Sequence, residues 1–353
     1  MAIQISLKQA PSLLMNVLTA GLAPMVCSSP GIGKSDIARK IAKEQNLKMI
    51  DVRLSQCDPS DLLGFPRIDK HTQKDGTIIE KAGYVPMETF PIEGDALPLD
   101  DNGNEMDGWL LFLDEMNSAP LSVQAASYKI VLDREVGIHS LHPNVAIMAA
   151  GNLATDKAIV SRMSTAMQSR MVHFELAIDN DAWLDWAADA GIDYRIIAYI
   201  NWRPENLHNF DPNHSDKTFP CPRTWHFLSK IVKPMKEISM DKAALLAGTV
   251  GEGAGMEFRN FCDIFESLPT LTDILAAPGT IEVPREPSVL YALTGMLTQH
   301  IEETNIGKLM LLINRLPIEF QVISLQGVLK RNRKLIAEKS VKEWVVKNSQ
   351  ELL

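Results

Sequence analysis

The chain has 353 residues, a formal net charge of −9 at pH 7, 46% hydrophobic residues and 22% charged residues. This length is enough for two domains with real cores, and the composition is that of an ordinary globular protein. The pI of about 5.4 argues against a surface made for nucleic acid, although a local basic face stays open. No leader, bilayer-length apolar run or zinc-type cysteine spacing is found, so we predict a cytoplasmic protein with four free thiols and no membrane contact.

The first predicted elements are two helices around a short strand. An amphipathic helix covers residues 7–21 and ends at Gly21. Residues 25–27 form an apolar run suited to a buried strand, and residues 36–43 carry apolar side chains at helical spacing. The stretch between them, residues 28–35, therefore connects a strand to a helix, which is the context that a phosphate-binding loop requires.

This connecting stretch has the composition of a phosphate-binding loop, Ser28-Ser29-Pro30-Gly31-Ile32-Gly33-Lys34-Ser35. Its glycines let backbone N–H groups point at phosphate oxygens, and the helix start adds partial positive charge. Lys34 would reach the β- and γ-phosphates, and the Ser35 hydroxyl would ligate Mg²⁺. Ser28 stands where the usual pattern has its first glycine, and the alternative interpretation is an ordinary glycine-rich turn before a helix.

Residues 47–107 predict a second strand, a short helical turn and an insertion. The strand covers residues 47–54, and the capped turn covers residues 58–64. Residues 65–107 are rich in Gly, Pro, Asp and Lys, and we interpret them as an insertion carrying hairpins, because a structureless loop of this length is uncommon. Residues 100–105 alternate Asp and Asn as a calcium loop does but lack its full pattern, so we expect a solvated turn.

Residues 109–115 predict a strand that is buried on both faces and ends in two carboxylates. The run Trp-Leu-Leu-Phe-Leu is continuously apolar, as in parallel sheets. Asp114 and Glu115 then lie where ligands bind in open α/β sheets. Asp114 could hold Mg²⁺ through water, and Glu115 could orient or deprotonate an attacking water. The alternative is that two acids merely end a strand.

The next region adds one further polar strand end. Asn152 follows the buried strand 145–150, where it could reach a γ-phosphate or the attacking water. The alternative is a turn residue. The other predicted elements are a helix over 118–133 capped by Ser118, a hairpin over 134–143, a helix over 161–170 and a strand over 171–176.

After Ala177 the pattern changes to helices, so we predict a nucleotide-binding core over residues 1–177 and a helical unit over residues 178–353. Arg223 begins a helix, where a cation opposes the helix dipole; this indicates a phosphate, and the alternative is a surface arginine. The basic run 330–334 is typical of a solvated face but could meet an acidic partner. The predicted helices are Asp181–Ala190, Ile192–Trp202, Pro222–Ile231, Met240–Phe265 and a helical stretch from Pro287 onward.

Taken in this order, the motifs resemble those of the AAA+ ATPases, and within them the MoxR-type group. The hairpin at 134–143, ahead of the Asn152 strand, points to the MoxR and chelatase side of that family. The resemblance is strong from about residue 10 to 232 and weak beyond. It implies a P-loop NTPase αβα core with a parallel sheet, followed by an all-helical lid and a C-terminal helical extension. The phrases that carry it are Ser29-Pro30-Gly31-Ile32-Gly33-Lys34-Ser35, Leu113-Asp114-Glu115-Met116-Asn117, Ala149-Ala150-Gly151-Asn152, Met167-Gln168-Ser169-Arg170 and Cys221-Pro222-Arg223.

The resemblance also implies a role for each matching residue. Arg170 looks like an arginine finger that acts on nucleotide held by a neighbouring subunit, and Arg162 competes with it for this role. Leu153 and Met171 depart from the residues frequent in the family, which are proline and phenylalanine. The remaining roles are ATP binding by Ser29, Pro30, Gly31, Ile32, Gly33, Lys34, Ser35 and Asp36, Mg²⁺ binding by Ser35 and Asp114, catalysis by the Walker B Glu115, and the first and second sensors, Asn152 and Arg223.

Three functions remain open at this point. The first is a Mg²⁺-dependent ATPase that forms a homo-hexameric ring and remodels or matures a protein client. By resemblance, such a client often carries a von Willebrand factor A domain. A metal-chelatase motor is a variant of this first function. The second is a nucleic-acid-directed motor, for which the basic C-terminal run and the hairpins would have to form a positive pore. The third is a nucleotide-dependent scaffold with little turnover, against which Glu115 argues.

Overall fold

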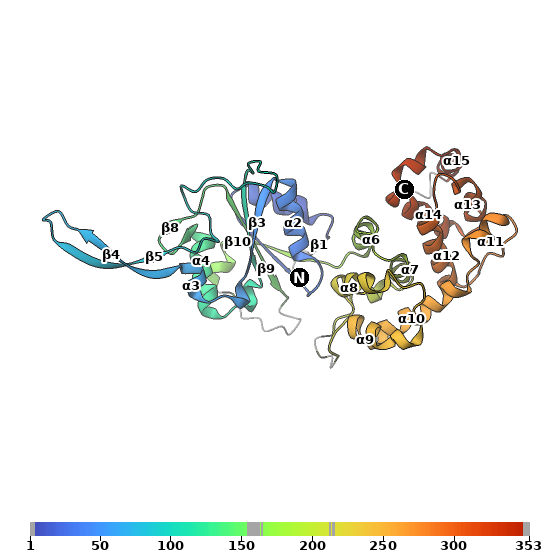
Figure 1. The fold of residues 1–353 in the computed structure, drawn as a ribbon, viewed down its shortest axis with the longest axis horizontal. Helices are drawn as coiled ribbons and strands as arrows, with labels where there is room; N and C mark the ends of the chain where they lie inside the picture. Colours follow the sequence, from blue (N-terminus) through green and yellow to red (C-terminus); the bar gives the residue numbers. More distant parts are fainter. Residues whose placement is uncertain (1–3, 154–162, 164, 212, 214–215, 349–353) are drawn as a thin grey trace. The chain divides into compact units, whose positions relative to one another are not determined.

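The structure is a computed structural model that describes residues 4–153, 163, 165–211, 213 and 216–348. The chain divides into two compact units, Met1–Ile178 and Asp179–Leu353, which we call unit 1 and unit 2. Figure 1 shows both strands and helices in unit 1, whereas the described residues of unit 2 are helical or irregular. Each unit has hydrophobic clusters of its own.

Unit 1 is built on a six-stranded sheet in which every neighbouring pair of strands is parallel. The strand order is β1-β10-β2-β9-β6-β3. The carboxyl ends of β2, β9, β6 and β3 therefore meet at one edge of the sheet, the place where ligands bind in open α/β folds. The bounds are β1 Gln4–Ile5, β2 Ala23–Ser28, β3 Leu47–Arg53, β6 Gly108–Asp114, β9 Val145–Asn152 and β10 Met171–Leu176.

The helices of unit 1 agree with the predicted ones except at their ends. The predicted start at Ser118 is wrong, because residues 116–118 form a 3₁₀ turn and α4 begins at Leu121. Pro120 is the cause, since a proline restricts the residue before it to an extended backbone. Residues 161, 162 and 164 of the predicted helix 161–170 lie outside the described residues. The bounds are α1 Ala10–Thr19, α2 Lys34–Glu44, α3 Pro59–Leu63, α4 Leu121–Leu132 and α5 Thr165–Gln168.

Both faces of the sheet are covered, which makes unit 1 a three-layer αβα structure. Leu110 and Phe112 of β6 pack into a cluster with residues of α1 and α2. Leu111 and Leu113, which point to the opposite face, pack into a cluster with residues of α4. All seven residues of β6 are buried, as predicted for a strand covered on both sides. The predicted α/β fold with a parallel sheet is thus confirmed.

Two antiparallel hairpins interrupt the parallel pattern, at the two places where hairpins were predicted. Strands β4 (Phe65–Thr72) and β5 (Ile78–Val85) pair along their whole length and extend away from the sheet of unit 1 as a ribbon (Figure 1). Strands β7 (Glu135–Val136) and β8 (His139–Ser140) form the second hairpin. A hydrogen bond of 3.0 Å between His139 Nε2 and the Tyr84 carbonyl oxygen joins the two hairpins.

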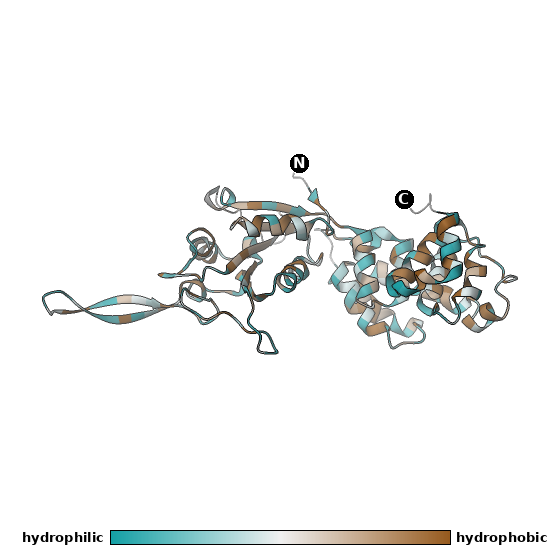
Figure 2. Ribbon diagram, turned by 90° about the horizontal axis from the view of Figure 1, so that it is seen from above, coloured by the Kyte–Doolittle hydropathy of each residue, from teal (hydrophilic) through white to brown (hydrophobic). Residues whose placement is uncertain are grey.

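Unit 2 contains helices that carry hydrophobic and hydrophilic faces (Figure 2). The single helix predicted over Met240–Phe265 is wrong, because Gly251, with φ of 90°, separates two helices there. Among the described residues, no helix is long and apolar enough to cross a membrane. The bounds are α6 Asn180–Asp189, α7 Tyr194–Trp202, α8 Pro222–Val232, α9 Ala243–Val250, α10 Glu252–Ser267, α11 Leu271–Ala276, α12 Pro287–His300, α13 Ile306–Ile313, α14 Ile318–Arg331 and α15 Lys339–Lys347.

Candidate functional site

The glycine-rich loop joins the carboxyl end of β2 to the start of α2. Gly31 and Gly33 have φ angles of 79° and 110°, a left-handed region that other residues rarely adopt. These two glycines allow the chain to turn tightly, so that α2 begins directly at Lys34. Ile32 points inward and is 5% exposed, whereas Ser29, Pro30 and Ser35 are half-buried and Asp36 is exposed. The loop thus surrounds the amino end of a helix with backbone N–H groups.

The Lys34 ammonium lies among the ends of two neighbouring strands. Lys34 Nζ donates hydrogen bonds to the Ser28 carbonyl oxygen at 3.0 Å, to Ser28 Oγ at 3.1 Å and to Asn152 Oδ1 at 3.2 Å. Ser28, which stands where a glycine is usual, is fully buried and its hydroxyl is one of these acceptors. The structure therefore places Asn152 beside the Lys34 ammonium, and both residues were predicted to belong to the site.

A hydroxyl and a carboxylate lie side by side next to this charge. Ser35 Oγ lies 3.4 Å from Asp114 Oδ2, and Asp114 is only 7% exposed. The other carboxylate oxygen, Asp114 Oδ1, accepts a hydrogen bond of 2.8 Å from the Glu115 backbone N–H. Mg²⁺ is usually held by one or two protein oxygen atoms together with phosphates and water, so this pair fits a Mg²⁺ ion.

Glu115 follows the strand in an unusual backbone conformation, with φ of 55°. Its carboxylate accepts a hydrogen bond from the Ser55 hydroxyl, and Arg53 Nε lies 3.9 Å from it. The sequence analysis missed Ser55 and Arg53. Their signal was their position directly at the end of the predicted strand 47–54, but only the pairing of β3 with β6 brings them to Glu115.

Asn117 is a third residue that the sequence analysis gave no role. Its side chain donates a hydrogen bond of 2.7 Å to the Asn152 carbonyl oxygen and accepts one of 3.0 Å from the Asn152 N–H. The Asn117 side chain therefore fixes the backbone that carries the Asn152 amide. The sequence feature that could have pointed to Asn117 is its position: a short polar residue directly after Asp-Glu-Met, in a turn between two predicted elements.

Two titratable side chains near the site, Asp51 and Cys27, have pKa values shifted by burial and by neighbouring charges. Burial raises the pKa of the Asp51 carboxyl, and the charge of Asp114 raises it further, whereas Arg39 and Arg53 lower it. Burial also raises the pKa of the Cys27 thiol on β2, and the positive charge of Lys34 partly offsets this rise. Negative charge at Asp114 thus favours a cation in its surroundings.

Arg170, the predicted finger, does not belong to this cluster. Met171, the residue after Arg170, pairs with Ala23 at the amino end of β2, whereas the loop begins at the carboxyl end. Five residues of strand separate the two ends, a distance of roughly 16 Å. Arg170 instead lines a pocket of about 760 Å³ at the amino ends of the strands. Arg162 lies outside the described residues. Arg223 is exposed in the first turn of α8, in unit 2, and no hydrogen bond or ion pair joins it to another described residue.

Comparison with models of known protein families gives no match, and neither does comparison with curated proteins. Similar solved structures include a predicted ATPase from Cytophaga hutchinsonii, with 15% identity and a TM-score of 0.33 over 98% of this chain and 89% of that one. They also include two variants of RuvB from Thermotoga maritima, each with 15% identity and a TM-score of 0.37, over 89% and 85% of this chain and 86% and 83% of theirs. These low scores support no inference about function. The proposal below therefore rests on the geometry of the chain's own site.

Proposed function

We propose that this chain is a Mg²⁺-dependent ATPase of the AAA+ type that works as an oligomeric ring and remodels a protein client. One observation carries the proposal. At a single edge of the sheet, the Lys34 ammonium lies between Ser28 and Asn152, and the Ser35 hydroxyl lies 3.4 Å from the buried Asp114 carboxylate. A cation, a metal-ligand pair and an amide at the mouth of a glycine-rich loop are the parts that phosphoryl transfer needs.

Each side chain would serve the reaction in its own way. Lys34 would leave its carbonyl acceptors and neutralise the transferred phosphate, while Ser35 and Asp114 would hold Mg²⁺, which supplies further charge stabilisation. Glu115 would orient or deprotonate the attacking water. Asn152, held by Asn117, would donate its amide N–H to the γ-phosphate or to that water. The residues from Ser29 to Asp36 would bind the remaining phosphates through backbone N–H groups and the helix start.

The position of Arg170 supports a finger supplied by a neighbouring copy. Arg170 lies at the amino ends of the strands and the phosphate loop at their carboxyl ends, so Arg170 would not serve the loop of its own chain. An arginine supplied from a second copy accelerates phosphoryl transfer by about 10³–10⁵-fold in other ATPases and GTPases. Hydrolysis would then require a closed ring, for which we propose six subunits, and Arg223 in the helical unit would act as the second sensor.

The client is proposed to be a protein. The net charge of −9 disfavours nucleic acid, and the ribbon β4–β5 exposes large apolar side chains, such as Ile68 and Ile78 at 72% and 63%, which could meet a protein surface. A von Willebrand factor A domain protein is one candidate client.

The test is ATP hydrolysis as a function of protein concentration, with the oligomer mass measured in parallel. We expect specific activity to rise as the ring forms, Glu115→Gln and Arg170→Ala to abolish it, and both variants to keep the ring. Lys40→Ala, which removes an exposed cation elsewhere in unit 1, serves as the control. Mixing the Glu115→Gln and Arg170→Ala proteins should restore activity, because sites with Glu115 from one copy and Arg170 from the other are complete. Activity that is flat in concentration and survives the loss of Arg170 would refute the ring mechanism.

A further inference from the structure

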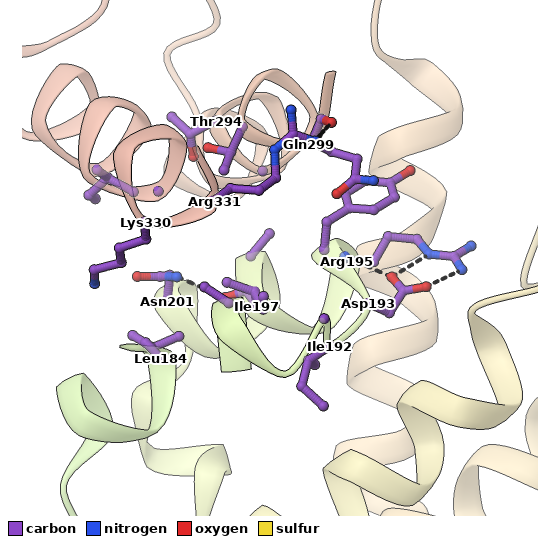
Figure 3. A pocket seen from close by; sticks show the side chains of 18 of the residues that line it. Leu184, Ile192, Asp193, Arg195, Ile197, Asn201, Thr294, Gln299, Lys330 and Arg331 are labelled. Atoms are coloured by element: carbon purple, nitrogen blue, oxygen red, sulfur yellow. Dashed lines mark hydrogen bonds and ion pairs between the residues drawn. The ribbon is translucent and has the colours of Figure 1, made fainter. Parts of the chain in front are cut away.

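Unit 2 contains a pocket of its own, with a volume of about 740 Å³, among α6, α7, α12 and α14 (Figure 3). All its lining residues lie between Asp181 and Arg331, so the pocket belongs to unit 2 alone. Small-molecule sites typically measure about 300–1,000 Å³ and combine apolar walls with a few polar groups. The pocket therefore has the size of a ligand site, and the proposed ATPase function does not use it.

Two contacts of α14 hold the pocket walls together. Lys330 forms an ion pair with Asp185 of α6. Arg331 donates hydrogen bonds to the carbonyl oxygens of Gln299 and Ile301 at the carboxyl end of α12. Both contacts join helices that are distant in the sequence, so the pocket is formed before any ligand enters it.

A buried ion pair fixes the wall formed by the start of α7. Arg195 donates to the two carboxylate oxygens of Asp193, from Nε at 3.0 Å and from Nη2 at 2.7 Å (Figure 3). Arg195 Nη1 also donates to the Met235 carbonyl oxygen at 3.0 Å, which ties α7 to the segment after α8. Because both residues are about 95% buried and paired, their charges cancel inside the pocket wall.

The remaining charge of the pocket is positive. Arg331 and Lys233 donate to backbone carbonyl oxygens, and no ion pair joins either of them to a carboxylate among the described residues. Lys236 has no hydrogen bond or ion pair from its side chain to another described residue. Against these three cations, Asp181 is the one lining carboxylate that has no paired cation among the described residues. A positive pocket in a chain of net charge −9 favours a negatively charged ligand.

The other lining groups suit a ligand with an apolar body. Leu184, Ile197 and Ile323 supply apolar walls. The lining also includes polar side-chain atoms that make no hydrogen bond to other described residues, namely those of Thr298, Gln299 and Gln326 and the Oδ1 of Asn201. These atoms are accessible, and a ligand entering the pocket would meet unused hydrogen-bonding groups.

We propose that this pocket binds a small organic anion, a molecule with an apolar body and a carboxylate or phosphate group. The cations Arg331, Lys233 and Lys236 would hold the anionic group, and the apolar walls would hold the body. A ligand bound there would join α6 and α7, at the start of unit 2, to α14, which lies more than 100 residues further along the chain.

The test measures binding of defined probes to the full chain by equilibrium dialysis. The probes are 2-naphthoate and 2-naphthyl phosphate, with neutral 2-naphthamide as the matched control. We expect at least one of the two anions to bind with one molecule per chain and roughly tenfold more tightly than the amide, because only the anions gain from the positive charge. Binding to Lys34→Ala must be unchanged, which separates this pocket from the phosphate loop and keeps the outcome independent of the ATPase proposal.

Two variants place negative charge on the pocket wall at residues whose side chains make no hydrogen bond or ion pair to another described residue. Lys236→Glu and Gln326→Glu should each weaken binding of the anion by roughly fivefold or more. The control Lys339→Glu changes a side chain that is 90% exposed and lies outside the pocket, and it should leave binding unchanged. Melting temperatures confirm that all variants fold. Equal binding of anion and amide, or equal effects of Lys236→Glu and Lys339→Glu, would overturn the proposal.

Discussion

The Ser55 hydroxyl donates a hydrogen bond to the Glu115 carboxylate, and this contact joins the 3₁₀ turn after β3 to the residue that we propose as the catalytic acid-base group. Arg53 adds an ion pair of 3.9 Å to the same carboxylate. The contact is possible because β3 pairs with β6 in a register that places Arg53 opposite Asp114. Glu115 is thus held toward β3 by two partners.

Releasing Glu115 from Ser55 should increase basal ATP turnover. A carboxylate that accepts a hydrogen bond is less available to water, and such a bond is worth about 1 kcal/mol. We therefore expect Ser55→Ala to raise turnover by roughly two- to fivefold, measured by phosphate release. Ser55→Thr keeps the hydroxyl and should resemble the wild type. A drop in turnover of Ser55→Ala, with Thr at the wild-type value, would mean that Ser55 positions Glu115 for the reaction instead.

The Asn117 amide should matter for both stability and catalysis. Asn117→Ala leaves the N–H and carbonyl of Asn152 without their partners in a buried place, since Asn117 is 7% exposed. We expect the free energy of unfolding to fall by about 2–3 kcal/mol in urea titrations and turnover to fall as Asn152 loses its position. The control Asn16→Ala, on an exposed part of α1, should change that free energy by less than about 0.5 kcal/mol. Equal effects of the two substitutions would contradict the role given to Asn117.

Local patterns predicted the parts of the site, and the sheet order decided which parts meet. The apolar run before Asp114 and the glycines before Lys34 are local signals that span only a few consecutive residues. The strand, the loop and the helix could therefore all be predicted from the sequence. Ser55 and Asn117 act across strands, and nothing in their own neighbourhood says that β6 lies between β3 and β9. The start of α4 was predicted wrongly because Ser118 can cap a helix. Pro120, two residues later, keeps Ala119 extended and therefore delays the helix start to Leu121.

The Cys262 thiol should make stability depend on pH in the alkaline range. Burial raises its pKa to about 12, and the charge of Arg195 opposes this shift. Below pH 9 the thiol is protonated in both states; between pH 9 and 12 only the unfolded chain loses the proton, so stability falls as pH rises, by at most about 1.4 kcal/mol per pH unit. We expect urea titrations at pH 7.5, 9.5 and 10.5 to give a steeper loss for the wild type than for Cys262→Ala. Parallel losses would show that this thiol titrates normally.

The buried pair Asp193–Arg195 should be the most sensitive polar contact of unit 2. Arg195→Met leaves a carboxylate that is 4% exposed without its cation and also frees the carbonyl oxygens of Val232 and Met235. We expect the free energy of unfolding to fall by about 3–5 kcal/mol. The double change Asp193→Asn with Arg195→Met should cost less than the sum of the single changes, because no unpaired charge remains buried.

Urea unfolding of the full chain, followed by circular dichroism, measures these differences. Lys339→Met serves as the surface control, because its ion pair with Glu343 joins two exposed side chains and should contribute less than about 0.5 kcal/mol. An Arg195→Met loss as small as that of Lys339→Met, or strict additivity in the double variant, would show that solvent reaches the pair and screens it. A large loss would instead confirm that this pair holds α7 to the segment after α8, and with it the wall of the pocket in unit 2.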